Sequence, residues 1–386
     1  MTAPVVVLAP DSFKGSLDAP AVCAALAAGL RRVWPDAVPR HCPMADGGEG
    51  TLDAVLAAAA GAGVRRQRVV RGASGQPVAA GYGVLGTGHD AVAVIEVAQV
   101  VAITDAVAMQ AGVRDRDTRG IGELLRQLLD DGLRRFMIGL GGSSTNDGGA
   151  GLLAALGLDL FDAQRRPVAA SPAGLAALAA VDAGRLDPRL AQSSITLMSD
   201  VNNPLCGALG ATAVFGPQKG VTAAEVAMLD AILGRFAALT EEALGVSAAT
   251  RPGAGAAGGL GFALQLIGGT FRSGAAVVAD LNGLDRALAG ADWVLTGEGR
   301  SDAQTLLAKA PFVVAQRARA AGVPATLVSG AVDPAALTVL GAHFAGAFAL
   351  APGPITLADC IARTDALLAD RAAELARLFA AIRRSP

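Results

Sequence analysis

The chain has 386 residues, of which 32 are basic and 34 acidic, so its formal net charge is −2, and 52% of its residues are hydrophobic. This length predicts two or three domains with sizeable cores, and a balanced charge with only 17% charged residues argues against nucleic acid or another polyanion as a partner. The four cysteines form no CxxC pair and the three histidines lack metal-ligand spacing, which argues against a disulfide framework and a structural zinc site.

Neither the N-terminal segment nor any internal stretch resembles a targeting or membrane-spanning sequence. Residues 1–15 contain a short apolar run with no basic residue before it, so we expect no secretory signal there. The long uncharged stretches 253–271 and 334–358 are interrupted by glycine, and the second also by proline. We therefore expect a cytoplasmic protein with no membrane partner.

Short β-rich apolar runs alternate with longer segments of helical period, which predicts an α/β fold with mainly parallel strands. Strands are expected at residues 5–9, 92–97, 136–140, 195–199, 293–296, 325–329 and 347–350. Three helix starts are indicated by Asp18 as N-cap with Pro20 behind it, by a capping box of Thr222 with Glu225, and by one of Ser301 with Gln304.

The end of the chain has the apolar spacing of a helix that packs on a sheet. Within residues 356–382 one stripe is formed by Ile361, Leu368, Leu375, Leu378, Phe379 and Ile382.

The alternation is most regular toward the two chain ends. Residues 4–33 form one strand–loop–helix unit that is too small to be a domain, whereas 286–355 alternate strands and helices. We expect residues 1–72 and 286–386 to build one doubly wound α/β domain, and residues 73–285 to form a second α/β domain inserted into it.

Lysine is rare in this chain, which makes each lysine informative. Of the 32 basic residues 29 are arginine, and the remaining three are Lys14, Lys219 and Lys309. Lys14 and Lys219 precede glycine, and a flexible ammonium beside glycine N–H groups suits a phosphate. The alternative is that leftover lysines fall near glycine by chance in a glycine-rich chain.

Polar residues are concentrated directly after two predicted strands. One cluster spans residues 139–149 and contains Asn146 and Asp147, and the other spans 199–204 and contains Asn202 and Asn203. Ligands of α/β proteins bind at the carboxyl ends of strands, and a following helix N-terminus favours an anion. Asp147 alone is also explained as the N-cap of a tight turn.

Carboxylates recur in glycine-rich loops at strand ends. They are Asp11, Asp46, Glu49, Asp200, Glu298 and Asp302. Such groups suit Mg²⁺ or a general base, although each also suits an N-cap or a turn. Together with the lysines and N–H groups they favour phosphoryl transfer, whose catalysis is mostly positioning and charge neutralisation.

Two GxGxxG matches raise the alternative of a dinucleotide-dependent oxidoreductase. They begin at Gly253 and Gly81, but chance supplies about one match in a chain with 49 glycines, and no strand is predicted before the first match. A P-loop, a protein-kinase motif set and a nucleophile elbow are absent from the sequence. A binder of sugar acids without catalysis is a third class, disfavoured by the lysine and carboxylate clusters.

Taken in order, these clusters resemble those of the type 1 family of bacterial glycerate kinases, the glycerate 2-kinases, along essentially the whole chain. The matching stretches are PDSFKGSL at 10–17, ADGGEGT at 45–51, GGSSTNDGGAG at 141–151, DVNNPLCG at 200–207, FGPQKG at 215–220, GAGAAGGLG at 253–261 and TGEGR at 296–300. Two departures occur, because Ser301 stands where the family usually has an aliphatic residue and Ala308 where it usually has glycine.

The resemblance implies ATP-dependent phosphorylation of D-glycerate with Mg²⁺, usually at the 2-hydroxyl to give 2-phosphoglycerate. It also implies two α/β domains, one of them flavodoxin-like or Rossmann-like. The sequence leaves a monomer and a homodimer equally open.

The residues are assigned roles as hypotheses. Arg300 or the 141–149 loop is expected to bind the glycerate carboxylate, and Lys14 and Lys219 the phosphates. Asp200 or Asp46 is expected to act as base while the other holds Mg²⁺, so both are candidate metal ligands. The predicted catalytic residues are Asp200, Lys14, Asp46 and Lys219, and the predicted substrate- or nucleotide-binding residues are Ser12, Gly47, Gly48, Glu49, Ser143, Ser144, Thr145, Asn146, Asp147, Asn202, Asn203, Glu298, Arg300 and Asp302.

Overall fold

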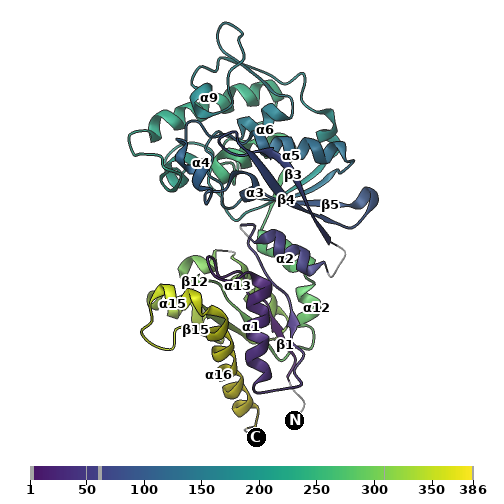
Figure 1. Cartoon of the computed structure of the whole chain (residues 1–386), viewed down its shortest axis with the longest axis vertical. Helices are drawn as coiled ribbons and strands as arrows, with labels where there is room; N and C mark the ends of the chain where they lie inside the picture. Colours follow the sequence, from purple (N-terminus) through teal and green to yellow (C-terminus); the bar gives the residue numbers. More distant parts are fainter. Residues whose placement is uncertain (1–3, 49, 60–62, 308, 385–386) are drawn as a thin grey trace. The chain divides into compact units, whose positions relative to one another are not determined.

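The computed structural model describes residues 4–48, 50–59, 63–307 and 309–384 (Figure 1). The fold is α/β, as predicted, and the chain forms two compact units. Unit 1 consists of residues 1–46, 53–61 and 273–386, and unit 2 of residues 47–52 and 62–272. Both chain ends therefore belong to unit 1.

Unit 1 contains a five-stranded sheet whose four strand pairs are all parallel in the described residues. Its strands, in spatial order, are β15 (Gly346–Ala349), β13 (Ala325–Ser329), β11 (Trp293–Thr296), β1 (Val6–Leu8) and β2 (Arg40–His41). Numbered along the chain within this sheet, the order is 2-1-3-4-5, which is found among flavodoxin-like sheets. A small parallel pair is formed by β12 (Arg300–Ser301), which follows β11 in the chain, and β14 (Ala331–Val332), which follows β13.

Helices of unit 1 flank this sheet, and α1 packs along α16. The helices are α1 (Ala19–Arg31), α2 (Thr51–Ala58), α11 (Gly274–Leu281), α12 (Leu284–Leu288), α13 (Ala310–Ala320), α14 (Leu337–Gly341), α15 (Leu357–Ala362) and α16 (Thr364–Arg384), with 3₁₀ turns η5 (Ala303–Leu306) and η6 (Pro334–Ala336). Figure 1 shows α1 and α16 side by side. Leu26 of α1 and Leu368 of α16 share one core with Leu8 of β1, which removes all three side chains from water.

The predicted apolar stripe at the chain end is only partly buried. Leu368 and Leu375 are in the core, and the Phe379 ring stacks on Trp293 with centroids 4.8 Å apart. Leu378 and Ile382 are 55% and 65% exposed, however, so the prediction that the whole stripe packs is wrong. The break between α15 and α16 also places Ile361, which is 40% exposed, on a separate helix from the rest of the stripe.

Unit 2 contains a six-stranded mixed sheet. In spatial order its strands are β10 (Thr270–Arg272), β9 (Ser194–Met198), β6 (Arg135–Gly139), β5 (Val92–Glu96), β4 (Pro77–Leu85) and β3 (Gly63–Arg71). The four strands from β10 to β5 are parallel, while β4 pairs antiparallel with both β5 and β3. The carboxyl ends of β6 and β9 therefore lie at the same edge of the sheet.

The helices of unit 2 bury one large core with this sheet. They are α3 (Ala98–Val101), α4 (Ala106–Gln110), α5 (Arg119–Asp130), α6 (Ala150–Ala155), α7 (Pro172–Leu175), α8 (Ala211–Phe215), α9 (Val226–Leu244) and α10 (Leu260–Leu266). The 3₁₀ turns are η1 (Gly88–Asp90), η2 (Pro188–Gln192), η3 (Pro217–Lys219) and η4 (Ala256–Gly259), and a hairpin joins β7 (Asp159–Phe161) to β8 (Ala180–Asp182).

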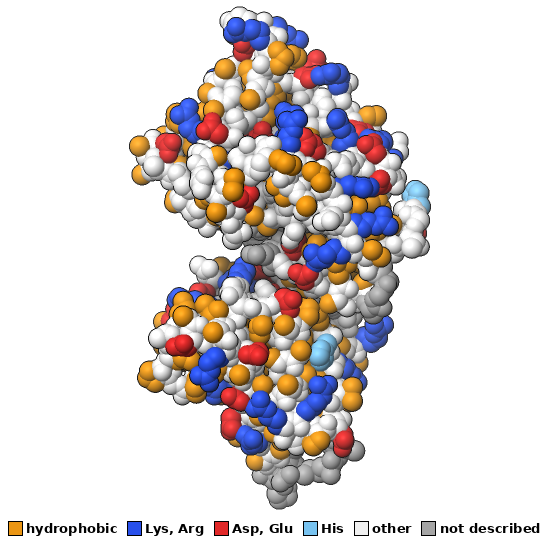
Figure 2. Space-filling model, in the orientation of Figure 1, with side chains coloured by type: hydrophobic (Ala, Val, Ile, Leu, Met, Phe, Trp, Pro, Cys, Tyr) orange, Lys and Arg blue, Asp and Glu red, His pale blue; other side chains and the backbone are white. Residues whose placement is uncertain are grey.

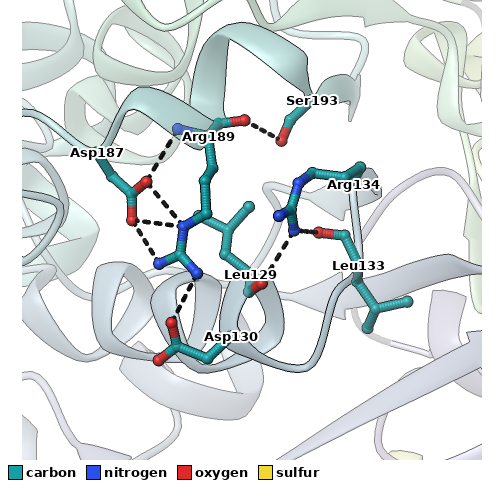
Figure 3. A network of polar contacts seen from close by, with 7 residues as sticks. All are labelled: Leu129, Asp130, Leu133, Arg134, Asp187, Arg189 and Ser193. Atoms are coloured by element: carbon teal, nitrogen blue, oxygen red, sulfur yellow. Dashed lines mark hydrogen bonds and ion pairs between the residues drawn. The ribbon is translucent and has the colours of Figure 1, made fainter.

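A polar network at the amino ends of β6 and β9 ties α5 to η2 (Figure 3). Arg189 donates to Asp187 at 2.7 Å and to Asp130 at 2.8 Å. Arg134 donates to the carbonyl oxygen of Leu129, near the end of α5, at 2.9 Å. These contacts fix the segments that lead into the two strands whose opposite ends carry the polar loops.

The seven predicted strands are all present within one or two residues of their expected bounds. Two capping predictions are wrong in register. Asp302, not Ser301, caps η5 and forms the box with Thr305. The Glu225 carboxylate does accept from Thr222 N at 3.0 Å, yet α9 begins only at Val226. The predicted cap at Asp18 is confirmed, since its carboxylate accepts from Ala21 N at 2.8 Å.

The domain boundaries expected after residues 72 and 285 stay a prediction. In the compact units, residues 62–72 group with the middle of the chain because β3 pairs with β4 along nine residues. Residues 273–285 group with the chain ends, because α11 and α12 pack on α13.

The drawn surface shows basic and acidic side chains interspersed over both units (Figure 2). This agrees with the balanced composition. In the parts of the chain that the structure describes, no helix is both long and apolar enough to span a bilayer.

The close approach of α1 to α16 depends on Gly29. A Cβ added there would lie 2.2 Å from Ala369 O and 2.7 Å from Ala372 Cβ, whereas one added at Gly341 on α14 would meet nothing within 4 Å. Gly29→Ala is expected to lower the free energy of unfolding of unit 1 by about 1–3 kcal/mol through overpacking. Gly341→Ala, the control, is expected to leave it unchanged or raise it by up to about 1 kcal/mol. Denaturant unfolding measures both, and an unchanged Gly29→Ala protein would contradict the packing argument.

Candidate active site

A cavity of about 540 Å³ in unit 1 collects many of the predicted residues. It lies at the carboxyl ends of β1 and β11, where the loops 11–14 and 298–300 leave the sheet. Its polar wall contains Asp11, Ser12, Lys14, Asp46, Glu298, Arg300 and Lys309, and its apolar wall Phe13, Leu350, Leu357 and Ile361. Three cations, three carboxylates and an apolar surface thus face one space.

Two carboxylates of this cavity repel each other. Asp11 is 6% exposed, and burial raises its pKa well above the usual value, with the charge of Asp46 raising it further. Ser12 N donates to Asp11 at 2.6 Å and, with Lys14, partly offsets this rise. A buried carboxylate whose charge is destabilised by a neighbouring carboxylate belongs to a donor set that suits a divalent cation.

Glu298 is held in place by a small hydroxyl network. Its carboxylate accepts from Ser301 Oγ at 3.0 Å and from Thr305 Oγ1 at 2.6 Å, and Lys309 Nζ lies 3.6 Å away. Ser301, the first departure from the family pattern, therefore donates a hydrogen bond to a cavity carboxylate. Asp302 instead caps η5, accepting from Gln304 N at 2.8 Å. Ala308, the second departure, lies outside the described residues.

In unit 2 the loop after β6 is organised by the buried carboxylate of Asp147. It accepts hydrogen bonds from Thr118 N at 2.9 Å, Thr118 Oγ1 at 2.7 Å, Gly149 N at 3.1 Å and Gly151 N at 3.0 Å. Burial raises the pKa of Asp147 to about 6, and the charge of Asp117 adds to the rise. With four donors already directed at it, this side chain shapes the loop.

Lys219, on η3, is buried beside the same loop with an exposed fraction of 2%. Its Nζ donates to Ser143 Oγ at 3.1 Å and to Thr145 O at 2.8 Å. Burial lowers the pKa of Lys219 to about 7. Lys219 and Ser143 both line a second cavity, of about 250 Å³.

The remaining predicted residues of unit 2 lie around these strand ends. Ser144 donates to Val101 O and Asn146 to Thr212 Oγ1, both at 3.0 Å, so these side chains are engaged within the fold. Asn203 donates to Leu209 O at 2.8 Å, while Asn202 is exposed. Asp200 is half-buried and directly precedes Val201, which lines the second cavity.

Gly47 joins the same group of loops. Its carbonyl oxygen accepts from Gly141 N at 3.3 Å, and its φ of +92° lets it pass Met198 O, which a Cβ would approach to 2.4 Å. Gly48 follows it and lies against Gly141. Glu49 lies outside the described residues.

All three lysines of the chain line one of these cavities. Lys14 and Lys309 line the cavity of unit 1, and Lys219 lines that of unit 2. Each is therefore placed where a ligand could reach it. The expectation drawn from their rarity is consistent with this placement, while their roles stay a prediction.

The residue patterns missed two important residues. Arg116 is 1% exposed and donates to Lys219 O, although its setting in the charged run 114–119 is typical of a solvated loop. Thr118 donates to Asp147, and no sequence signal distinguishes it from a surface threonine. Asp11 was noted only as a loop carboxylate, without a role.

The dinucleotide alternative gains no support. The segment before Gly253 forms no strand in the described residues, and Gly253–Gly261 folds back on the loop after β6, with Gly148 N donating to Gly258 O at 3.0 Å. Nor does any group of three or more His, Cys, Asp or Glu residues in the described part of the chain form a ready-made metal site.

Comparison with known proteins places this arrangement in one family. The profile of the Glycerate kinase family matches residues 6–380. The chain is 39% identical to a glycerate kinase of Halalkalibacterium halodurans over 96% of this chain and 97% of the relative. It is 40% identical to a glycerate 2-kinase of Escherichia coli over 85% of each.

The fold agrees with a solved structure as well. A crystal structure from Salmonella typhimurium LT2, assigned as a glycerate kinase 2, superposes with a TM-score of 0.85 and 39% identity, covering 99% of this chain and 100% of that one.

The chain belongs to the glycerate kinase family. The family resemblance drawn from the seven motifs is thereby confirmed, and the chain is an enzyme of the phosphotransferase class.

The role of Asp147 can be separated from ligand binding. Asp147→Asn leaves at least one buried N–H facing an amide NH₂, so it is expected to lower the free energy of unfolding at pH 7 by about 1–3 kcal/mol. Because the folded pKa of about 6 lies above the usual 3.8, the wild type loses stability as pH rises from about 4 to about 6, and the Asn variant lacks this component. The gap between the two proteins should therefore narrow over that range.

Denaturant unfolding at several pH values measures this gap. Asp182→Asn is the control, since Asp182 is exposed and accepts a hydrogen bond from Gly184 N at 2.8 Å. Equal stability of the Asp147 and Asp182 variants would count against the structural role.

Proposed function

We propose that this enzyme transfers the γ-phosphoryl group of ATP to the 2-hydroxyl of D-glycerate, giving 2-phosphoglycerate and ADP. The observation that carries the proposal is the family match over residues 6–380. The relative in Escherichia coli is a glycerate 2-kinase, which supports the choice of hydroxyl.

The unit 1 cavity is the proposed nucleotide site. Its volume of about 540 Å³ is within the usual range for small-molecule sites. Lys14, Arg300 and Lys309 supply positive charge for phosphates, while Phe13 and the apolar wall from α15 offer a surface for a base. Because phosphoryl transfer depends on neutralising charge, three cations in one cavity suit this role.

Mg²⁺ fits the carboxylates of the same cavity. Burial and the charge of Asp46 raise the pKa of Asp11 there, and a divalent cation shared with phosphate oxygens would relieve that repulsion. When bound, Mg²⁺ would neutralise charge on the transferring phosphates. Asp11 thereby joins Asp46 as a proposed ligand, and Asp200 remains the other candidate named from the sequence.

Asp200 is the proposed general base. It follows β9 at the carboxyl end of the parallel strands and directly precedes a residue of the unit 2 cavity. A carboxylate there could accept the proton of the acceptor hydroxyl. The residues of the 141–149 loop are proposed to position the acceptor, and Ser12 and Glu298 the nucleotide side.

The remaining expectations are proposed with this function. The two units are inferred to be two domains, unit 1 a doubly wound sheet built from both chain ends and unit 2 inserted into it. The enzyme is inferred to act in the cytoplasm as a monomer or homodimer, without nucleic-acid or membrane partners.

Product analysis tests the function directly. Purified protein with D-glycerate, ATP and Mg²⁺ is expected to release ADP and to give the phosphorus NMR signal of 2-phosphoglycerate. A 3-phosphoglycerate signal would keep the kinase and reject the hydroxyl assignment. ADP release that does not exceed a control without D-glycerate, from folded protein, would reject the proposed substrate.

Replacing the proposed base gives a second test. Asp200→Asn is expected to lower kcat by about 10²- to 10⁴-fold with folding intact, since this is the usual contribution of a general base. Asp90→Asn is the matched control, because the Asp90 side chain is 90% exposed and forms a surface ion pair with Arg135. A loss below about tenfold in the Asp200 variant would remove Asp200 from this role.

A further inference from the structure

The cavity of unit 2 is walled by glycine-rich loops and apolar side chains. It lies beyond the carboxyl ends of β6 and β9, from which Leu140 and Val201 contribute to the wall, and Phe215 and Ala257 close other sides. Its volume of about 250 Å³ is less than half of the 540 Å³ in unit 1. A compact ligand with a small apolar part fits such walls.

One polar group at this cavity has unused donor capacity. The Lys219 ammonium has three N–H donors, of which Ser143 Oγ and Thr145 O accept two. Ser143 and Lys219 line the cavity together and are 5% and 2% exposed. The third N–H of Lys219 and the hydroxyl of Ser143 are therefore available to hydrogen-bond one functional group of a ligand in the cavity.

The charge around Lys219 is not balanced by carboxylates. Among the described residues, no acidic side chain lies within ion-pair distance of Lys219 or of Arg116, and Arg116 Nε has no hydrogen-bond partner. Arg116 donates to the backbone oxygen of Lys219, so two buried cations are neighbours. Asp147 acts on Lys219 from farther away, and its oxygens already accept four hydrogen bonds.

Of the charges that act on Lys219, the carboxylate of Asp147 is opposed by the nearby cation Arg116, so the positive charge at Lys219 is not fully balanced. A buried charge without a partner is costly, so a fold that keeps one gains when an anion enters. A single surplus charge with mostly apolar walls matches a monoanion. A nucleoside triphosphate, with several negative charges and a larger volume, fits the three-cation cavity of unit 1 better.

We propose that the unit 2 cavity binds the carboxylate of the acceptor acid, with Lys219 Nζ and Ser143 Oγ as its direct contacts and Arg116 as a positioning residue behind Lys219. This assignment rests on the proposed function, because it takes the acceptor to be D-glycerate. Lys219 then serves the acceptor and not the nucleotide phosphates, and Arg300 serves the nucleotide.

The titration of Lys219 gives this site a pH dependence. Burial lowers the pKa of Lys219 to about 7, Asp147 raises it and Arg116 lowers it, and these are the charged groups that act on Lys219 within unit 2. The ammonium is therefore charged below about pH 7 and loses its proton above, while the carboxylate of glycerate stays ionised. Acceptor binding should weaken as pH rises from 6.5 to 8.5.

The test measures binding of D-glycerate and of ATP with Mg²⁺, each alone, to the full chain by calorimetry. Lys219→Met is expected to weaken the binding of D-glycerate at least tenfold and the binding of ATP less than twofold. Arg300→Met, its matched control in unit 1, is expected to weaken the binding of ATP at least tenfold and that of D-glycerate less than twofold. Ser143→Ala, a smaller change in case Lys219→Met misfolds, is expected to weaken D-glycerate several-fold. Lys219→Arg keeps its charge and should flatten the pH dependence.

Further ligands identify the bound group. Glycerol, which lacks the carboxylate, should not compete with D-glycerate, and inorganic phosphate should compete only weakly. The cavity assignment is overturned if phosphate binds more tightly than D-glycerate, or if Lys219→Met abolishes ATP binding and leaves D-glycerate binding unchanged. Neither result would contradict phosphorylation of D-glycerate by the wild type.

Failure of the proposed function looks different. If the wild type does not bind D-glycerate but binds another small hydroxy acid, and Lys219→Met abolishes that binding, the cavity assignment is supported and the proposed substrate is rejected. Wild type that binds no small carboxylate rejects both.

Discussion

The hydrogen bonds that converge on the buried carboxylate of Asp147 determine the geometry of unit 2. Thr118, before α5, and the backbone at the start of α6 both donate to it, so one side chain joins two elements that are adjacent in the core. The loop that begins at Gly141 is thereby held, and with it the carbonyl oxygen of Thr145 and the hydroxyl of Ser143. These two oxygens hold Lys219, whose own carbonyl oxygen accepts from Arg116.

Burying this many polar groups costs free energy, and only ordered hydrogen-bond or ion-pair partners offset that cost. In unit 2, Asp147 offsets it with four donors, whereas Lys219 has two neutral acceptors and Arg116 has one carbonyl oxygen and the sulfur of Met109. In unit 1, Glu298 accepts from two hydroxyls and pairs with a lysine, whereas burial and the charge of Asp46 raise the pKa of Asp11. Asp11 and Lys219 line the two cavities, and Arg116 lies directly behind Lys219. Bound ligands, and not other residues of the protein, would supply the opposite charges at these positions.

Much of the fold was predictable because its central strands are short, apolar and bounded by glycine. The β3–β4 hairpin was not predicted because β3 carries Arg65, Arg66 and Arg68 at an exposed sheet edge. Charged residues suit an edge strand, but they obscure the alternation of apolar and polar residues by which a strand is recognised. Site residues were found where composition made them rare, as with lysine. Their distribution between two cavities, and the burial of Arg116, depend on contacts between distant segments that one sequence does not reveal.

The contrast between lysine and arginine explains why rarity was informative. An arginine presents five donors in a rigid fork and keeps its proton when buried, so a pocket with two fixed oxygens and one ligand cannot satisfy it. A lysine with three rotatable donors can use two on the protein and leave one for the ligand, and its proton affinity can fall to near pH 7. A chain that otherwise uses arginine 29 times therefore has a physical reason to place lysine at position 219. The same reasoning applies less strictly to Lys14, whose exposed side chain is free to move.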